Sequence, residues 1–67
     1  MTALEILLEA LNFYEIKIIS VNKNNVKVQN KFEIEVEANG LYKLSDDGYI
    51  VAPFSDINEL CRFILSA

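Results

Sequence analysis

Few side chains in this 67-residue chain belong to the types that carry out catalysis. Cys61 is the only cysteine, and there is no histidine. General-base and nucleophilic catalysis mostly use histidine, or a serine or cysteine activated by a neighbouring base. A zinc site would have to be built from carboxylates, which is rare, and Asp46-Asp47-Gly48 matches a hairpin turn better than a calcium loop. We therefore expect no enzymatic activity, no metal and no cofactor.

Cys61 itself has the features of a structural residue. It falls on the apolar stripe of a predicted helix, and free cysteine is among the most buried residue types. A reactive thiolate needs exposure and a nearby cation, and Arg62 is the one cation close to it in the sequence. We expect Cys61 to be a small buried hydrophobe.

Glutamates are the remaining chemical feature. Glu33, Glu35 and Glu37 alternate along one predicted strand, which places them in a row on its water-facing side. Glu5 and Glu9 are four residues apart on a predicted helix, with no lysine to pair them. An ordinary solvated surface explains both groups, with lysines on the neighbouring strands offsetting the row. The alternative is that these five glutamates bind a basic partner protein.

The first element that positions these residues is an N-terminal helix. Thr2 and Glu5 fit a capping box, so the helix should begin there. Its apolar residues recur at helical spacing: Leu4, Leu7, Leu8 and Leu11, with Ile6, Ala10 and Phe13 widening the stripe toward the core. Aromatic and β-branched residues follow, and these favour strands, so the helix should end near Tyr14.

A run of short strands and turns fills the middle of the chain. Strands are predicted at residues 15–21, 26–29, 32–37, 41–44 and 49–52, the last ended by Pro53. The turns between them are rich in asparagine, aspartate and glycine: Asn22–Asn25, Asn30-Lys31 as a two-residue type I′ link, Asn39-Gly40 and Ser45–Gly48. Each strand is short and each link is tight, so we expect an antiparallel meander.

A second helix closes the chain. Ser55 is its expected N-cap, with Asp56 and Glu59 in the first turns, where carboxylates complement the helix dipole. Its stripe consists of Ile57, Leu60, Cys61 and Ile64, broadened by Phe63 and Leu65. Residues 1–67 thus form a single α+β domain: a helix, a meander of about five strands, and a helix.

So small a domain needs extra stabilisation, and self-association is the remaining source. A chain of this length buries only about 60% of its unfolded surface, and domains this small commonly add disulfides, a metal or oligomerisation. The outermost strands are apolar on both faces, with Ile16 and Ile18 on one face of the first strand, Ile19 and Val21 on the other, and Tyr49–Val51 in the last. A curled sheet, one helix on each face, or a second copy would cover them.

We favour the second copy. The expected homodimer interface consists of Ile19, Val21, Leu41, Tyr49 and Val51.

The net charge of the chain limits the kinds of partner that we expect. The net charge of −4 and the absence of a basic cluster disfavour nucleic acids and anionic membranes. Glu5 and Glu9 interrupt the apolar start, and no basic residue precedes them, so we expect a cytoplasmic protein without a signal peptide. The leading hypothesis is a small, non-catalytic protein-interaction module acting as a homodimer. The alternative is a small-molecule-binding module with an apolar pocket between sheet and helices.

Overall fold

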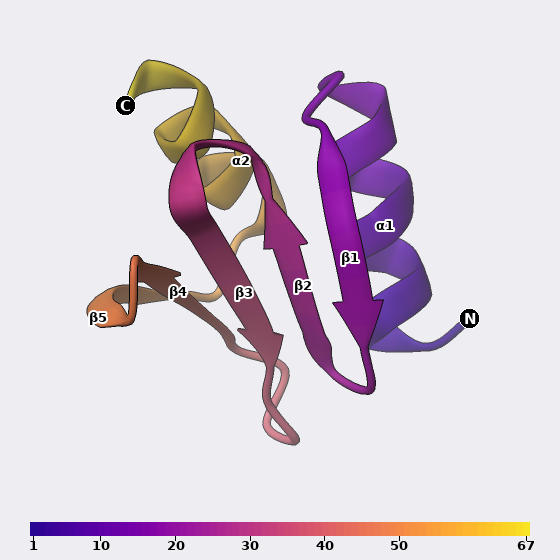
Figure 1. Cartoon of the computed structure of the whole chain (residues 1–67). Coiled ribbons are helices and arrows are strands. Elements are labelled where there is room, and N and C mark those ends of the chain that lie inside the picture. The colour runs from indigo at the N-terminus through magenta and orange to yellow at the C-terminus, as the bar shows by residue number, and fades with distance from the viewer.

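Two helices lie against one face of a five-stranded antiparallel sheet, in a computed structural model that describes residues 1–67 (Figure 1). The elements are α1 (Ala3–Phe13), β1 (Ile18–Asn22), β2 (Asn25–Val28), the short 3₁₀ turn η1 (Gln29–Lys31), β3 (Phe32–Val36), β4 (Tyr42–Asp46), β5 (Tyr49–Phe54) and α2 (Ile57–Ser66). The strands pair in chain order, which leaves β1 and β5 as the two edges. The predicted helix–meander–helix fold is confirmed.

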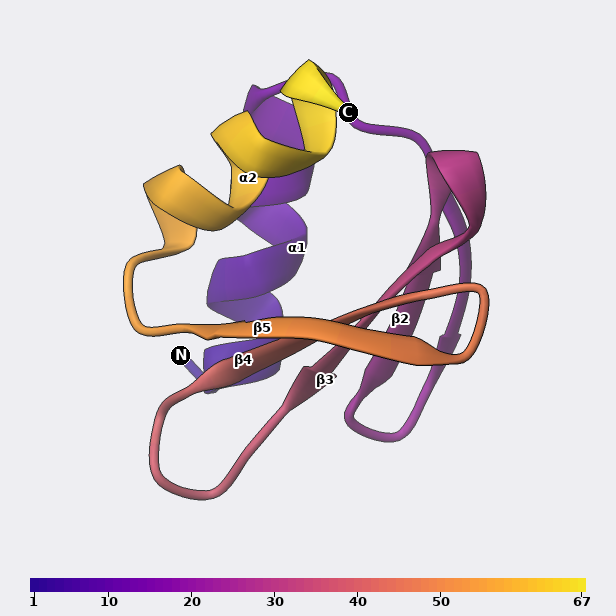
Figure 2. The same cartoon turned by 90° about the vertical axis from the view of Figure 1, so that its left-hand side faces the viewer.

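The sheet is strongly twisted. Figure 2 shows β4 and β5 running across the direction of β2, with both helices on the same side of the sheet. The sheet does not close, because β1 and β5 pair only with β2 and β4. Of the three arrangements considered for the outer strands, neither a closed curl nor a helix on each face is present, and one sheet face is bare.

Both ends of α1 are fixed by local hydrogen bonds. The Thr2 amide donates to the Glu5 carboxylate (2.9 Å), and the Glu5 amide donates to the Thr2 hydroxyl (3.1 Å), which confirms the capping box. At the other end Glu15 takes a left-handed conformation (φ 59°), and the Ile16 amide donates to the Leu11 carbonyl (2.9 Å). This is a Schellman motif. It turns the chain away from the helix, so β1 begins at Ile18 rather than at residue 15.

The core lies between the helices and the sheet. Thirteen residues are buried, and all are apolar: Leu7, Leu11, Ile16, Val26, Val28, Phe32, Ile34, Val36, Tyr42, Leu44, Leu60, Cys61 and Ile64. Cys61 is fully buried, as predicted, and burial raises the pKa of its thiol. Each fully buried Leu or Ile contributes about 1.5–3 kcal/mol relative to exposure.

The apolar helix stripes are narrower than the sequence predicts. Ile6 and Phe13 of α1, and Phe63 and Leu65 of α2, are exposed rather than part of the core. The sheet covers each helix from one side only, so the residues at the margins of each stripe stay in solvent. Phe63 retains edge contacts with the rings of Phe32 and Phe54.

The link from β5 to α2 also differs from prediction. β5 continues through Pro53 to Phe54, because an edge strand can accept a residue that lacks an amide hydrogen. The N-cap of α2 is therefore Asp56, not Ser55. One carboxylate oxygen of Asp56 accepts from the amides of Asn58 (2.8 Å) and Glu59 (3.4 Å).

Two of the predicted turns carry the expected backbone conformation. Asn30 and Lys31 both have positive φ (62° and 66°), as do Asp47 and Gly48 (51° and 90°). Positive φ at two successive central residues is the type I′ pattern that suits the twist of a hairpin. These turns join β2 to β3 and β4 to β5.

Candidate interaction surfaces

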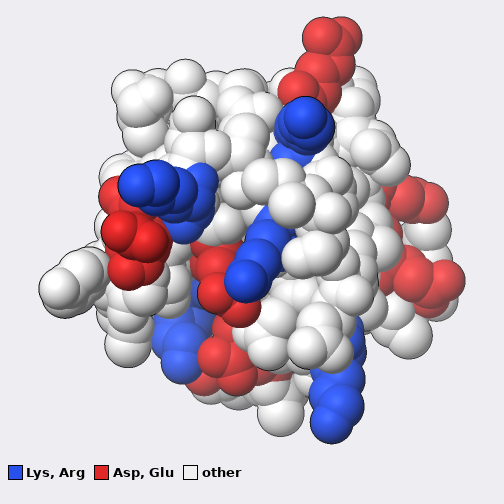
Figure 3. Space-filling view, viewed as in Figure 1, with Lys and Arg blue, Asp and Glu red and all other residues white.

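The face of the sheet that the helices leave bare, here called the outer face, carries a balanced set of charges. Its strand residues include Lys27 on β2, Glu33 and Glu35 on β3, and Lys43 on β4. Their neighbours in sequence are the buried core residues, which is the alternation expected of a sheet covered on one side. Basic and acidic atoms accordingly interleave over the middle of this face (Figure 3).

One of the two cross-strand pairs forms a salt bridge. Glu35 and Lys43 are register partners, and the Lys43 ammonium lies 3.0 Å from the Glu35 carboxylate. The hydrogen bond and the charge of Glu35 raise the pKa of Lys43. Lys27 and Glu33 are also register partners, but no ion pair joins them within the protomer. Both groups therefore remain available to an external partner.

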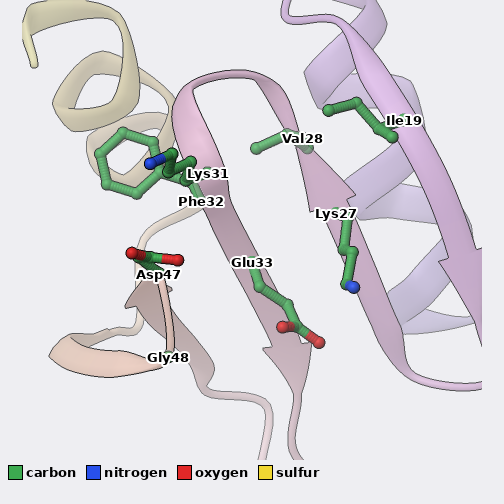
Figure 4. A pocket seen from close by; sticks show the side chains of 8 residues that line it. All are labelled: Ile19, Lys27, Val28, Lys31, Phe32, Glu33, Asp47 and Gly48. Carbon is green, nitrogen blue, oxygen red and sulfur yellow. The ribbon is translucent and has the colours of Figure 1, made fainter.

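A hollow of about 270 Å³ opens on the outer face beside Lys27 and Glu33 (Figure 4). Its lining residues are Ile19, Lys27, Val28, Lys31, Phe32, Glu33, Asp47 and Gly48. Small-molecule sites usually occupy about 300–1,000 Å³ and are mostly apolar. Half of the lining residues of this hollow are charged, namely Lys27, Lys31, Glu33 and Asp47, and three are apolar.

Two further hollows open elsewhere on the surface. One lies on the outer face near Glu35 and Ile50, and the other lies where the start of α1 meets the end of β3. Side chains of the core fill the interior between the sheet and the helices.

A β-bulge in β1 changes which side chains share a face. Ile18 pairs with Val28 and Val21 pairs with Val26, so both lie on the helix side of the sheet. The register shift between them leaves Ile19 on the outer face, where it lines the hollow beside Lys27. The prediction that Ile19 and Val21 share one face is wrong, because the bulge inserts a residue into the alternation.

A second bulge acts on β5 in the same way. Ala52 pairs with Leu44 and Ile50 pairs with Ser45, so Val51 is the additional residue. Ile50 consequently lies on the outer face beside Lys43 and is 67% exposed.

The five residues expected at the dimer interface are therefore not one surface. Ile19 lies on the outer face, Val21 lies on the helix side, and Val51 occupies the bulge. Tyr49 begins β5 and is highly exposed, whereas Leu41 precedes β4 and is half-buried. The structure instead places Ile19 and Ile50 on the outer face, on its two edge strands.

The apolar residues of the outer strands are shielded only in part by their own chain. Ile16 is buried and Ile18 is half-buried. Four others are between 40% and 67% exposed, namely Ile19, Val21, Ile50 and Val51.

The glutamates expected to bind a partner fall into two separate regions. Glu33 and Glu35 are half-buried between lysines, and Glu37 follows the end of β3, where its amide donates to the Leu41 carbonyl. The row is therefore not a continuous acidic strip. Glu5 and Glu9 lie on α1, which packs against the face of the sheet opposite to the outer face.

The exposed side of α1 combines these carboxylates with apolar side chains. Ile6 and Phe13 lie seven residues apart on this side and are 42% and 80% exposed, whereas Ala10 between them is half-buried against the core. Glu5 and Glu9 run alongside them. The Thr2 hydrogen bonds lower the pKa of Glu5. Sequence reasoning missed this surface because it assigned Ile6 and Phe13 to the core.

Comparison with protein-family models, with curated proteins and with solved structures finds no match to this chain. Neither helix is long and apolar enough to cross a bilayer. No three cysteine, aspartate or glutamate side chains converge closely enough to hold a metal ion.

Proposed function

We propose that this protein is a small cytoplasmic protein-interaction module that acts as a homodimer and has no catalytic activity. The observation that carries the proposal is the exposure of Ile19 and Ile50 on the outer face, where they are 61% and 67% exposed in the protomer. Removing this apolar surface from water stabilises an assembly by about 25 cal/mol per Å². A domain with a core of thirteen residues benefits from that contribution.

Charge balance supports the outer face as the contact between copies. The two lysines and two glutamates on its strands sum to zero, so the other twelve charged residues carry the whole net charge of −4. Two copies that meet through the outer face therefore avoid like-charge repulsion. A two-fold dimer also needs a surface complementary to itself, and lysine beside glutamate meets that need.

Contact between faces is favoured over contact between strand edges. Each edge strand contains a bulge, and β5 also contains Pro53. Both features interrupt the row of backbone groups that a second strand would pair with.

We place a two-fold axis parallel to β2 and β3, running midway between them. This axis determines which residues of the two copies face each other. In that arrangement Lys27 of one protomer faces Glu33 of the partner subunit, and the reverse pair forms across the axis. Aligned packing of two sheets is a common arrangement in proteins. The two groups that lack an ion pair in the protomer thereby acquire one.

Charge reversal combined with mixing tests this arrangement. Glu33→Lys would place four lysines at the axis of the dimer, two from each copy, and Lys27→Glu would place four glutamates there, so each variant alone should be monomeric by light scattering. Mixing the two should restore a dimer, because the lysines at positions 27 and 33 of one chain then face the glutamates at the same positions of the other. If the dimer forms only when the two variants are mixed, the ion pairs at positions 27 and 33 must form between chains and not within one chain.

The control is Lys17→Glu, which changes the charge equally at an exposed position before β1. This variant should remain dimeric. The proposed register is rejected if either reversal at the axis stays dimeric or if the mixture stays monomeric.

A further inference from the structure

The exposed side of α1 is a second surface with a different character from the outer face. Its exposed apolar side chains are Ile6 and Phe13, about 10 Å apart along the helix at 1.5 Å per residue, with Ala10 between them half-buried against the core. Phe13 is 80% exposed and Ile6 is 42% exposed. The Phe13 ring makes one edge contact, with the Tyr14 ring at 5.3 Å between centroids, and the rest of its surface is open to another molecule.

The charges beside these two side chains determine what can cover them. Glu5 and Glu9 are the only charged residues of α1, and no lysine or arginine precedes Lys17. Figure 3 shows acidic atoms and no basic atoms at the edge of the molecule formed by α1. The only salt bridge in the chain involves neither glutamate.

This charge disfavours a second copy as the occupant of the exposed side of α1. Two copies related by a two-fold axis along α1 would bring four carboxylates together, and like charges at an interface cost several kcal/mol. A partner that carries lysine or arginine beside an apolar stripe is complementary to this surface. Its cations attract Glu5 and Glu9, and its apolar side chains can pack against Ile6 and Phe13.

The shape of the surface selects a helical partner. An extended peptide gains its affinity from an open sheet edge, which α1 does not provide. A helix can pack its own apolar residues, spaced at i, i+3, i+4 and i+7, against a stripe with helical spacing. Basic residues one turn apart on such a helix would reach Glu5 and Glu9, which are also one turn apart.

We propose that the exposed side of α1 is a docking site for a basic amphipathic helix of a partner protein. Ile6 and Phe13 provide the apolar contact, and Glu9 with Glu5 provides the charge. This inference rests on the proposed role as an interaction module and names the chemistry of the partner.

The test uses two synthetic peptides of about 18 residues, long enough to be helical when bound. Both carry leucine on one face, and the other face carries lysine in one peptide and glutamate in the other. Affinity is measured by fluorescence anisotropy, and the binding site is mapped by amide shifts of the full chain. The lysine peptide should bind and shift amides of α1, and the glutamate peptide should not bind.

Matched variants locate the effect. Glu9→Lys and Phe13→Ser should each weaken binding of the lysine peptide by about tenfold, equivalent to about 1.4 kcal/mol. Both positions are exposed, so both variants should fold. Asp46→Lys changes the net charge as much as Glu9→Lys does, at the far end of β4, and should leave the affinity unchanged.

Three results of the peptide experiments would overturn the proposal. They are failure of the lysine peptide to bind, equal weakening by Glu9→Lys and Asp46→Lys, and amide shifts that fall on the sheet instead of α1. Conversion of the free protein to a monomer by Phe13→Ser would also overturn it, since α1 would then be the contact between copies. The mass of each free protein, measured separately, distinguishes failure of this site from failure of the dimer.

Discussion

Single residues determine how α1 ends. Glu15 occupies the left-handed position of the Schellman motif, with φ 59°. A non-glycine residue in this conformation costs about 1–2 kcal/mol. The Schellman motif nevertheless forms, because the burial of Leu11 and Ile16, whose backbone groups it joins, offsets this cost.

Glu15→Gly should therefore stabilise the protein. Glycine removes the strain at positive φ, and part of that gain is offset by the greater freedom of glycine in the unfolded chain. We expect a net gain of about 0.5–1 kcal/mol, which raises Tm by a few degrees in a domain of this size. Thermal unfolding followed by circular dichroism measures it. Glu15→Ala keeps the strain and should show no gain, and an equal gain in both variants would contradict this explanation.

The capping box makes α1 sensitive to pH. The hydrogen bonds from Thr2 lower the pKa of Glu5 in the folded state, so ionised Glu5 stabilises the fold at pH values above its unfolded pKa. That contribution is lost as the pH falls through the folded pKa. Valine at position 2 removes the hydroxyl but keeps the backbone amide, whose hydrogen bond is the main cause of the lowered pKa, so a carbon-detected NMR titration should show only a partial rise of the Glu5 pKa in Thr2→Val. An unchanged pKa in that variant would contradict the role of the Thr2 hydroxyl.

At the scale of elements, the helices, strands and turns follow local rules that the sequence displays. The capping box, the alternation of β3 and the asparagine and aspartate turns each predicted a structure that is present. The bulges in β1 and β5 could not be predicted from the sequence of each strand alone. A bulge is defined by the register with the neighbouring strand, and the sequence does not show that register. The candidate surfaces depend on those bulges, since they place Ile19 and Ile50 on the outer face.

The helices illustrate the same limit. Apolar spacing correctly identified the buried stripe of α1, but the width of that stripe depends on how far the sheet extends on either side. Ile6 and Phe13 lie beyond that margin. Local sequence therefore predicts which residues point toward the core, and tertiary packing decides where the core ends.

Substitutions on opposite sides of α1 should differ in their effect on stability. Leu11→Ala removes a fully buried side chain and should cost about 2–5 kcal/mol in the free energy of unfolding. Phe13→Ala, two positions away but exposed, should cost no more than about 0.5 kcal/mol. Urea unfolding of both variants measures the difference. A large cost for Phe13→Ala would show that Phe13 belongs to the core.

At the scale of the whole molecule, the charge distribution separates two surfaces. The outer face is neutral and carries Ile19 and Ile50, whereas the exposed side of α1 is acidic and carries Phe13. The neutral face suits a second copy and the acidic face suits a basic partner. The two helices lie on the side of the sheet away from the outer face, so both contacts can form at once (Figure 2).

Light scattering coupled to size exclusion measures the molecular mass in solution, and it is the most direct test of self-association. We predict a mass of about 15 kDa at micromolar concentration, twice the 7.6 kDa of one chain. The predicted mass should fall to that of one chain in Glu33→Lys. A wild-type protein that stays at 7.6 kDa throughout the micromolar range would contradict the homodimer.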